Sequence, residues 1–269
     1  IGKSISVEEY NVACKKAVMK YTSHWNELTK KMGYWVDMED PYITYKSKYI
    51  ETVWWLLKNL FDKGLIYKGY TVQPYSPKAG TGLSSHELNQ PGTYQNVTDT
   101  SVIAQFKAIN KSLPAFLKKF DELYFLAWTT TPWTIPSNTA LTVGLKIKYV
   151  LVSTFNQYTF QKINVILAED LISKVFSTNF FEIENIDLLM YDPKTNKKIP
   201  YIKCINLHGK DLLNIKYEQI WSEAPVPYKN SENAFRIISG DFVTTEEGTG
   251  IVHTAPTFGA DDAKAAKEA

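Results

Sequence analysis

The stretch LYFLAWTTTPWTIPSNTALTV, residues 123–143, sets the expectation for the fold. It combines a strand over Leu123–Thr129, a hydroxyl-rich loop and a second strand over Thr139–Val143. Pro132 and Pro136 are expected to hold the loop backbone extended, because proline fixes φ and removes an amide donor.

Similar short β-type runs surround this stretch, with turn residues between them. They are Thr100–Ala108, Tyr149–Thr154, Val165–Ala168, Tyr201–Asn206, Phe235–Ile238 and Gly250–Thr254. One helix is expected near Asp170–Phe176. Many short strands of this kind predict a mixed, mainly β, barrel-like domain.

The first 75 residues have a different pattern. Ser6 and Glu9 form a capping box that begins a helix reaching about Thr22, with a second helix to Lys31. Apolar residues at helical spacing predict a helix over residues 47–63, stopped at Gly64, and a strand over Leu65–Val72 follows. We therefore expect an α/β unit at 1–75, a connecting loop at 76–98 and the β domain at 99–269.

Composition excludes several classes of protein. The 269 residues carry a formal charge of +2, so no global nucleic-acid signal is present. No stretch of about 18 apolar residues occurs, so no membrane span is predicted. Cys14 and Cys204 match no disulfide framework, which fits a cytoplasmic protein. The chain begins with Ile1, and we interpret it as a piece of a longer protein.

The loop offers a specific surface for chemistry. Thr129, Thr130 and Thr131 present three successive hydroxyls, each able to donate and accept a hydrogen bond, and Trp133 adds an indole face. Such a surface suits a ribose, an ester and an ordered water. The alternative is a threonine-rich edge strand with a packed tryptophan.

A second segment, EGTGIVHTAPTFGADD at residues 247–262, places His253 at a strand end and Asp262 at a helix start. The nine-residue step between them can bring an imidazole and a carboxylate to one pocket wall. The alternatives are a satisfied core histidine and a helix N-cap at Asp261 or Asp262.

These segments resemble the isoleucyl-tRNA synthetase family. WTTTPWT (128–134) and GTGIVHTAP (248–256), with Asp261 and Asp262, are similar to the two segments that line the pocket of its editing insertion. DPYITY (40–45) and KGYTVQPYSP (68–77) resemble the synthetase core ahead of that insertion. The resemblance implies an α/β fragment of the class I nucleotide-binding core followed by an editing domain.

Three departures limit what the chain is expected to do. The HIGH and KMSKS signatures for ATP binding are absent, so ATP and Mg²⁺ are cofactors only of the parent ligase. Residues 75–95 contain no cysteine, so the zinc knuckle of many members is not expected, and no metal site is predicted. The family's insertion continues past Asp262, so we expect the domain to be incomplete.

The resemblance implies hydrolysis of Val-tRNA(Ile) by water, without a cofactor. Asp262 would hold the α-ammonium of the amino acid, and the three threonines would position the water and the ester. His253, Trp133 and Thr134 would form the pocket, and Asn138 would contact the adenosine. Whether His253 acts sterically or polarises the water stays open.

The expected partner is the tRNA(Ile) acceptor end carrying valine, bound by a monomer away from membranes. Two alternatives remain. The first is a non-catalytic module that grips the acceptor end. The second is a different hydrolase, which would show no dependence on tRNA.

Overall fold

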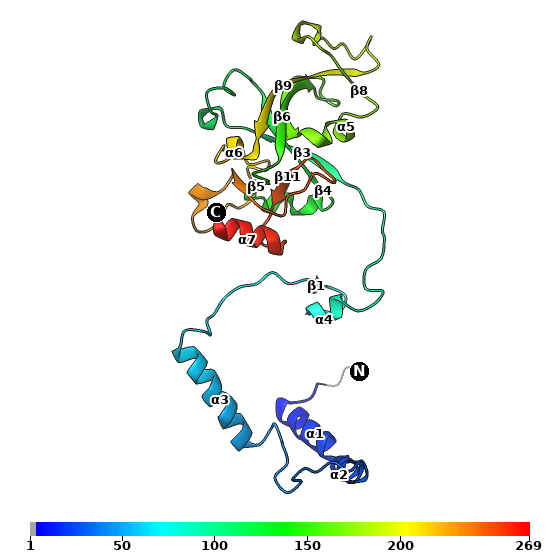
Figure 1. Ribbon diagram of the computed structural model, residues 1–269, viewed down its shortest axis with the longest axis vertical. Helices are drawn as coiled ribbons and strands as arrows, with labels where there is room; N and C mark the ends of the chain where they lie inside the picture. The colour runs from blue at the N-terminus through cyan, green and yellow to red at the C-terminus, as the bar shows by residue number, and fades with distance from the viewer. Residues whose placement is uncertain (1–3) are drawn as a thin grey trace. The chain divides into compact units, whose positions relative to one another are not determined.

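The computed structural model describes residues 4–269 (Figure 1). These residues fall into two compact units, 4–69 and Tyr70–Ala269. The first unit is helical and the second holds the large sheet. Across residues 4–269, none of the helices combines the length and apolarity needed to cross a bilayer.

The first unit contains three helices: α1 (Val7–Met19), α2 (Thr22–Lys31) and α3 (Ser47–Asp62). The expected capping box begins α1, since Ser6 Oγ accepts from the Glu9 amide at 3.1 Å. Gly64 ends α3 with a φ of +70°, a backbone conformation that glycine adopts without steric cost. Its amide donates to Phe61 O at 2.8 Å, so the predicted helix stop is confirmed.

The predicted strand over Leu65–Val72 is wrong. This segment has no regular structure, and Tyr67 and Tyr70 are fully or largely exposed. A strand needs a hydrogen-bonded neighbour to be stable, and none of the described strands pairs with this run. The next segment contains only a two-residue ladder, β1 (Tyr75–Ser76) with β2 (Thr81–Gly82), and the short helix α4 (Ser85–Leu88).

The second unit is built on a nine-stranded mixed sheet. Its order is β10-β5-β11-β4-β7-β6-β9-β8, with β3 paired to β4. The strands are β3 (Val102–Lys107), β4 (Leu123–Thr129), β5 (Ala140–Val143), β6 (Lys148–Phe155), β7 (Lys162–Ala168), β8 (Phe180–Glu182), β9 (Ile199–His208), β10 (Arg236–Ser239) and β11 (Ile251–Thr254).

The mixed, mainly β expectation for this unit is confirmed, and β8 is a strand that the sequence did not indicate. Closure into a barrel is not observed. Among the described residues, β10 and β8 form the two open ends of the sheet order and do not pair with each other.

The central strands are buried on both faces, because their side chains alternate between two apolar clusters. In β4, Phe125 and Ala127 enter the larger cluster, whereas Leu126 enters the smaller one. The same alternation occurs in β6, where Leu151 and Val152 point to opposite faces. This two-sided burial fixes the position and register of β4, which leads directly to the hydroxyl-rich loop.

Short helices complete the unit. They are η1 (Asn110–Ser112), η2 (Pro132–Ser137), η3 (Glu169–Leu171), α5 (Ile172–Val175), η4 (Ile186–Leu188), α6 (Gly209–Leu212), η5 (Ser231–Asn233) and α7 (Ala260–Glu268). In Figure 1, α7 lies beside β5, and its Ala265 packs with Ala140 and Ile238. Together, η3 and α5 match the helix expected near Asp170–Phe176.

The expectation of an extended loop after β4 is wrong, because residues 132–137 form the 3₁₀-helix η2. Pro132 stands in its first turn, where the missing amide hydrogen has no cost and a φ near −65° fits the helix. The Thr134 amide closes the turn by donating to Thr131 O at 3.0 Å. The loop therefore folds back toward the sheet.

Candidate functional site

The site lies at the carboxyl ends of the neighbouring interior strands β4 and β11. The two strands run parallel, with Val252 opposite Trp128, so their carboxyl ends point the same way. Strand β11 also pairs antiparallel with β5, which puts His253 opposite Leu141. We call residues 129–138 the hydroxyl loop.

Hydroxyl groups of three threonines form a continuous series in this loop. Thr129 Oγ1 lies 3.2 Å from Thr131 Oγ1 and accepts from the Thr131 amide at 3.0 Å. Thr134 Oγ1 lies 3.4 Å from Thr131 Oγ1 and donates to Thr131 O at 2.8 Å. Thr129 and Thr134 are buried, whereas Thr131 is half-buried and Thr130 is exposed.

His253 joins this series from β11. Its Nε2 lies 3.1 Å from Thr134 Oγ1, and its Nδ1 lies 2.9 Å from Asn138 Nδ2. Burial lowers the pKa of His253 to about 4, because an imidazolium loses hydration in this position. The side chain is therefore neutral at physiological pH.

One hydrogen bond connects Asp262 to the backbone just after β11. Its Oδ2 accepts from the Ala255 amide at 2.8 Å, two residues after His253. Burial raises the pKa of Asp262, the bond from Ala255 lowers it, and the charge of Asp261 raises it. Helix α7 starts at Ala260 with Gly259 as its N-cap, so neither aspartate serves as the cap. Asp262 instead links α7 to the strand.

Trp133 and Asn138 occupy opposite environments. Trp133 is 64% exposed, so its indole is open to a ligand rather than packed against the core. Asn138 is buried, and its amide bonds to His253, to Ala140 O at 2.8 Å and to Tyr217 Oη at 2.6 Å. The structure thus brings together the predicted residues 129, 131, 134, 138 and 253, and leaves 130 and 133 at the surface.

A cavity of about 770 Å³ adjoins the loop. Its wall includes Asn138 of the hydroxyl loop and Thr257, which follows β11. Lys229, Arg236 and Lys267 add positive charge to the same wall. An anionic group such as a phosphodiester is favoured by these charges.

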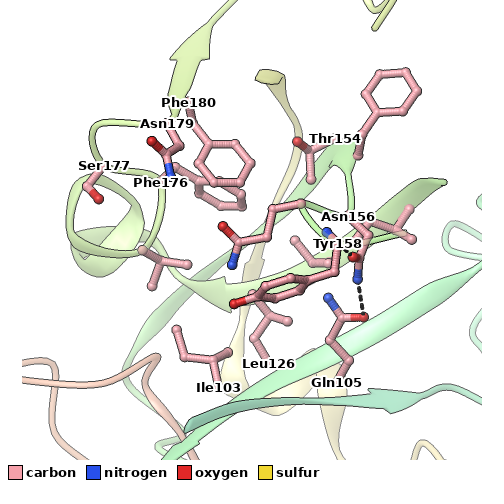
Figure 2. Close-up of a pocket in the computed structure, with 15 residues that line it drawn as sticks. Ile103, Gln105, Leu126, Thr154, Asn156, Tyr158, Phe176, Ser177, Asn179 and Phe180 are labelled. Carbon is pink, nitrogen blue, oxygen red and sulfur yellow. Dashed lines mark hydrogen bonds between the residues drawn. The ribbon is translucent and has the colours of Figure 1, made fainter. Parts of the chain in front are cut away.

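A second pocket, of about 280 Å³, lies over the smaller apolar cluster and is drawn in Figure 2. Apolar side chains such as Leu126 and Phe176 line it, with Gln105, Asn156 and Asn179 among its polar groups. Its lining holds no carboxylate, imidazole or cationic side chain. It lacks the groups that ester hydrolysis would use.

Metal ligands are not clustered over residues 4–269, where no group of three or more His, Cys, Asp or Glu side chains is placed to hold an ion. The hydroxyl loop and His253 thus form a site of neutral polar groups with one nearby carboxylate.

Tyr217 belongs to this site but was missed by sequence reasoning. It follows α6 as an isolated tyrosine, outside any motif, and its side chain is 1% exposed. The alternation of Ile215 and Tyr217, both buried, gives a signal of burial. It gives no signal that the hydroxyl would reach Asn138, 79 residues earlier in the chain.

Comparison with known proteins places the chain in a family. The model of class I tRNA synthetases (I, L, M and V) matches residues 2–243. The chain belongs to the class I tRNA synthetases. The resemblance found from the sequence is confirmed.

Isoleucine–tRNA ligases are similar to this synthetase chain over nearly all of its length. The ligase of Cytophaga hutchinsonii is 60% identical over 268 residues, covering 99% of the chain and 23% of the relative. That of Bacteroides fragilis is 57% identical over 270 residues, covering 100% of the chain and 23% of the relative. The chain thus spans about a quarter of the length of these relatives.

A leucyl-tRNA synthetase editing domain is also similar. The cytosolic P. knowlesi domain has a TM-score of 0.41 and 12% identity, covering 61% of this chain and 60% of that one.

Proposed function

We propose that this chain is the part of an isoleucine–tRNA ligase that removes valine wrongly esterified to tRNA(Ile). One methylene in an apolar pocket changes binding by only about 1–3 kcal/mol, a general figure for which isoleucyl-tRNA synthetases are themselves the usual example. A second, hydrolytic site is therefore useful. The observation that carries the proposal is the joined series of threonine hydroxyls and His253 at the end of β11, with Asp262 bonded to Ala255 beside it.

The proposed reaction is attack of water on the ester carbonyl. The water oxygen forms a bond to the carbonyl carbon, and the bond from that carbon to the ribose oxygen breaks. Valine leaves as the free amino acid, and the ribose oxygen takes a proton to restore the hydroxyl. Thr129, Thr130 and Thr131 would position the water and the ester, and backbone amides of the loop would stabilise the oxyanion.

Asp262 would hold the α-ammonium of the substrate by a charge-assisted hydrogen bond. Its Oδ2 is used by the Ala255 amide, and its other oxygen has no hydrogen bond within residues 4–269, so it is available to a ligand. Trp133 and His253 would form pocket walls that admit valine and exclude isoleucine. The cationic cavity would receive phosphodiesters of the acceptor end.

No step of the proposed hydrolysis uses a metal ion or ATP. We assign ATP and Mg²⁺ to the aminoacylation reaction proposed for the longer relatives.

Asp262→Asn tests the role of the carboxylate. The amide oxygen can still accept from Ala255, so the link to the strand is kept and only the charge is lost. A charge-assisted bond contributes about 1.5–3 kcal/mol, so hydrolysis of Val-tRNA(Ile) should fall about 10- to 100-fold. The matched control is Asp261→Asn, which changes the exposed neighbouring carboxylate and should retain near-normal hydrolysis.

Equal rates for Asp262→Asn and the wild type would contradict the assignment of Asp262. If the wild-type chain binds the acceptor end without cleaving the ester, the non-catalytic binding module is correct instead. Cleavage of simple esters without any dependence on tRNA would support an unrelated hydrolase.

A further inference from the structure

A buried chain of hydrogen bonds runs from Tyr217 to the hydroxyl loop. Tyr217 Oη lies 2.6 Å from Asn138 Oδ1, and Asn138 Nδ2 lies 2.9 Å from His253 Nδ1. His253 Nε2 then lies 3.1 Å from Thr134 Oγ1. Four residues form this chain, and each is between 1% and 7% exposed: Tyr217, Asn138, His253 and Thr134. Water therefore competes little for these bonds.

The orientation of the Asn138 amide is set by its surroundings. Asn138 Nδ2 lies 2.8 Å from Ala140 O, which can only accept. If the amide were turned over, two oxygen atoms would face each other at this distance with no hydrogen between them. Tyr217 agrees with this orientation, since burial raises its pKa well above its ordinary value and keeps a proton to donate to Oδ1.

The tautomer of His253 follows from the amide orientation. Asn138 Nδ2 donates to Nδ1, so Nδ1 must accept and the proton of the neutral ring must be on Nε2. Nε2–H then donates to Thr134 Oγ1, whose own proton goes to Thr131 O at 2.8 Å. Asn138 Nδ2 carries two hydrogens, which Ala140 O at 2.8 Å and His253 Nδ1 at 2.9 Å accept, and Thr254 O lies farther away at 3.5 Å. With this assignment the directions of the bonds in the series are consistent.

We propose that Asn138, anchored by Tyr217, is a positioning residue that holds His253 as the Nε2–H tautomer against Thr134. Neither ring nitrogen is free to take a proton from water, so His253 is a wall and a donor, not a general base. The statement about the base rests on the proposed function. The statement about the tautomer rests on hydrogen bonds alone.

Nitrogen NMR of the chain with ¹⁵N-labelled histidine tests the tautomer without any substrate. The chain has four histidines, and His253→Gln identifies the signals of His253 by their loss. At neutral pH, His253 should show a protonated Nε2 and an unprotonated Nδ1. A protonated Nδ1, or equal populations of the two tautomers, would overturn the proposal.

Tyr217→Phe tests the anchor. The ring keeps its edge-on packing with Phe106, at 5.3 Å between centroids, so the variant is expected to fold. Asn138 Oδ1 loses its donor, and the two ring nitrogen signals of His253 should move toward each other as the second tautomer becomes populated. If the proposed function holds, kcat for Val-tRNA(Ile) should fall about 5- to 10-fold with little change in KM, the equivalent of one buried hydrogen bond.

Tyr149→Phe is the matched control. It removes another buried hydroxyl, which bonds Gly144 N at 3.0 Å and Gly250 O at 2.7 Å, and which makes no bond to Asn138. Its His253 signals should match the wild type. Asn138→Ala removes the donor itself and serves if Tyr217→Phe is unfolded, with the same mixed tautomers expected. A folded Tyr217→Phe with the spectrum and kcat of the control would refute the positioning role.

The two proposals fail separately. A wild-type chain that shows the Nε2–H tautomer and cleaves no Val-tRNA(Ile) would refute the proposed function and leave the hydrogen-bond assignment standing.

Discussion

Replacing His253 with glutamine is expected to make the sheet unit less sensitive to acid. In the wild type, burial holds the pKa of His253 near 4, below its ordinary value of 6.5. Between these two values the unfolded chain binds a proton that the folded chain does not. Stability conferred by the neutral ring is therefore complete above about pH 6.5 and is lost as the pH falls toward 4.

The size of the effect follows from the two pKa values of His253. Each pKa unit corresponds to about 1.4 kcal/mol. Because the unfolded chain binds more protons than the folded chain, lowering the pH from 7 to roughly 4.5 reduces the stability of the folded form by about 2–3 kcal/mol. Other titrating groups, including Asp262 with its opposite, raised pKa, act in both wild type and variant and cancel in the comparison.

Urea unfolding followed by circular dichroism at both pH values measures this difference. The loss of stability on acidification should be about 2–3 kcal/mol smaller in His253→Gln than in the wild type. Leu141→Ala is the control, since Leu141 is fully buried opposite His253 and does not titrate. It should cost about 2–5 kcal/mol at both pH values and keep the wild-type pH dependence. An identical acid response in His253→Gln and the wild type would refute the argument.

Three further substitutions separate the effects of packing from those of binding. Gly250→Ala should destabilise the sheet unit by more than about 2 kcal/mol in urea, because Gly250 has a φ of +73° and a new Cβ would lie 2.3 Å from Ala168 Cβ. Gly33→Ala, with a similar φ of +76° but open space around it, should cost only about 1 kcal/mol. Trp133→Ala should change stability by less than about 0.5 kcal/mol, since the indole is 64% exposed, yet reduce the preference for valyl over isoleucyl ester in a deacylation assay. Unchanged selectivity in Trp133→Ala would remove the indole from the pocket.

Alternation of apolar residues was sufficient to predict most of the sheet. The strand expected at Leu123–Thr129 has those same bounds in the structure, because its side chains are divided between two apolar clusters. The same reasoning failed at Leu65–Val72, where an equally β-like run has no paired strand among the described residues. Whether a segment has a neighbouring strand to pair with depends on the tertiary fold, and the sequence of the segment alone does not indicate it.

The motifs predicted that the side chains of the site would lie together, but they did not predict the bonds between them. Thr129, Thr131 and His253 were expected to share one pocket, and the structure joins them through Thr134. The helical turn at Pro132 was not foreseen, because proline fits both an extended segment and a first helical turn.

Hydrogen bonds between distant segments could not be predicted from the sequence. The sequence indicated a contact of Asn138 with the adenosine, which stays a prediction, but it did not indicate the bonds of the Asn138 amide to four protein groups, three of them from distant segments. Tyr217 is 79 residues away from Asn138 in the sequence, so no local sequence pattern indicates that the two side chains form a hydrogen bond.

The most direct measurement is the rate at which this chain deacylates Val-tRNA(Ile) compared with Ile-tRNA(Ile), at equal concentrations and without ATP. We expect hydrolysis of the valyl ester and preservation of the isoleucyl ester, with the difference lost in Asp262→Asn. Equal cleavage of both esters, or cleavage of neither while the tRNA is bound, would contradict this expectation.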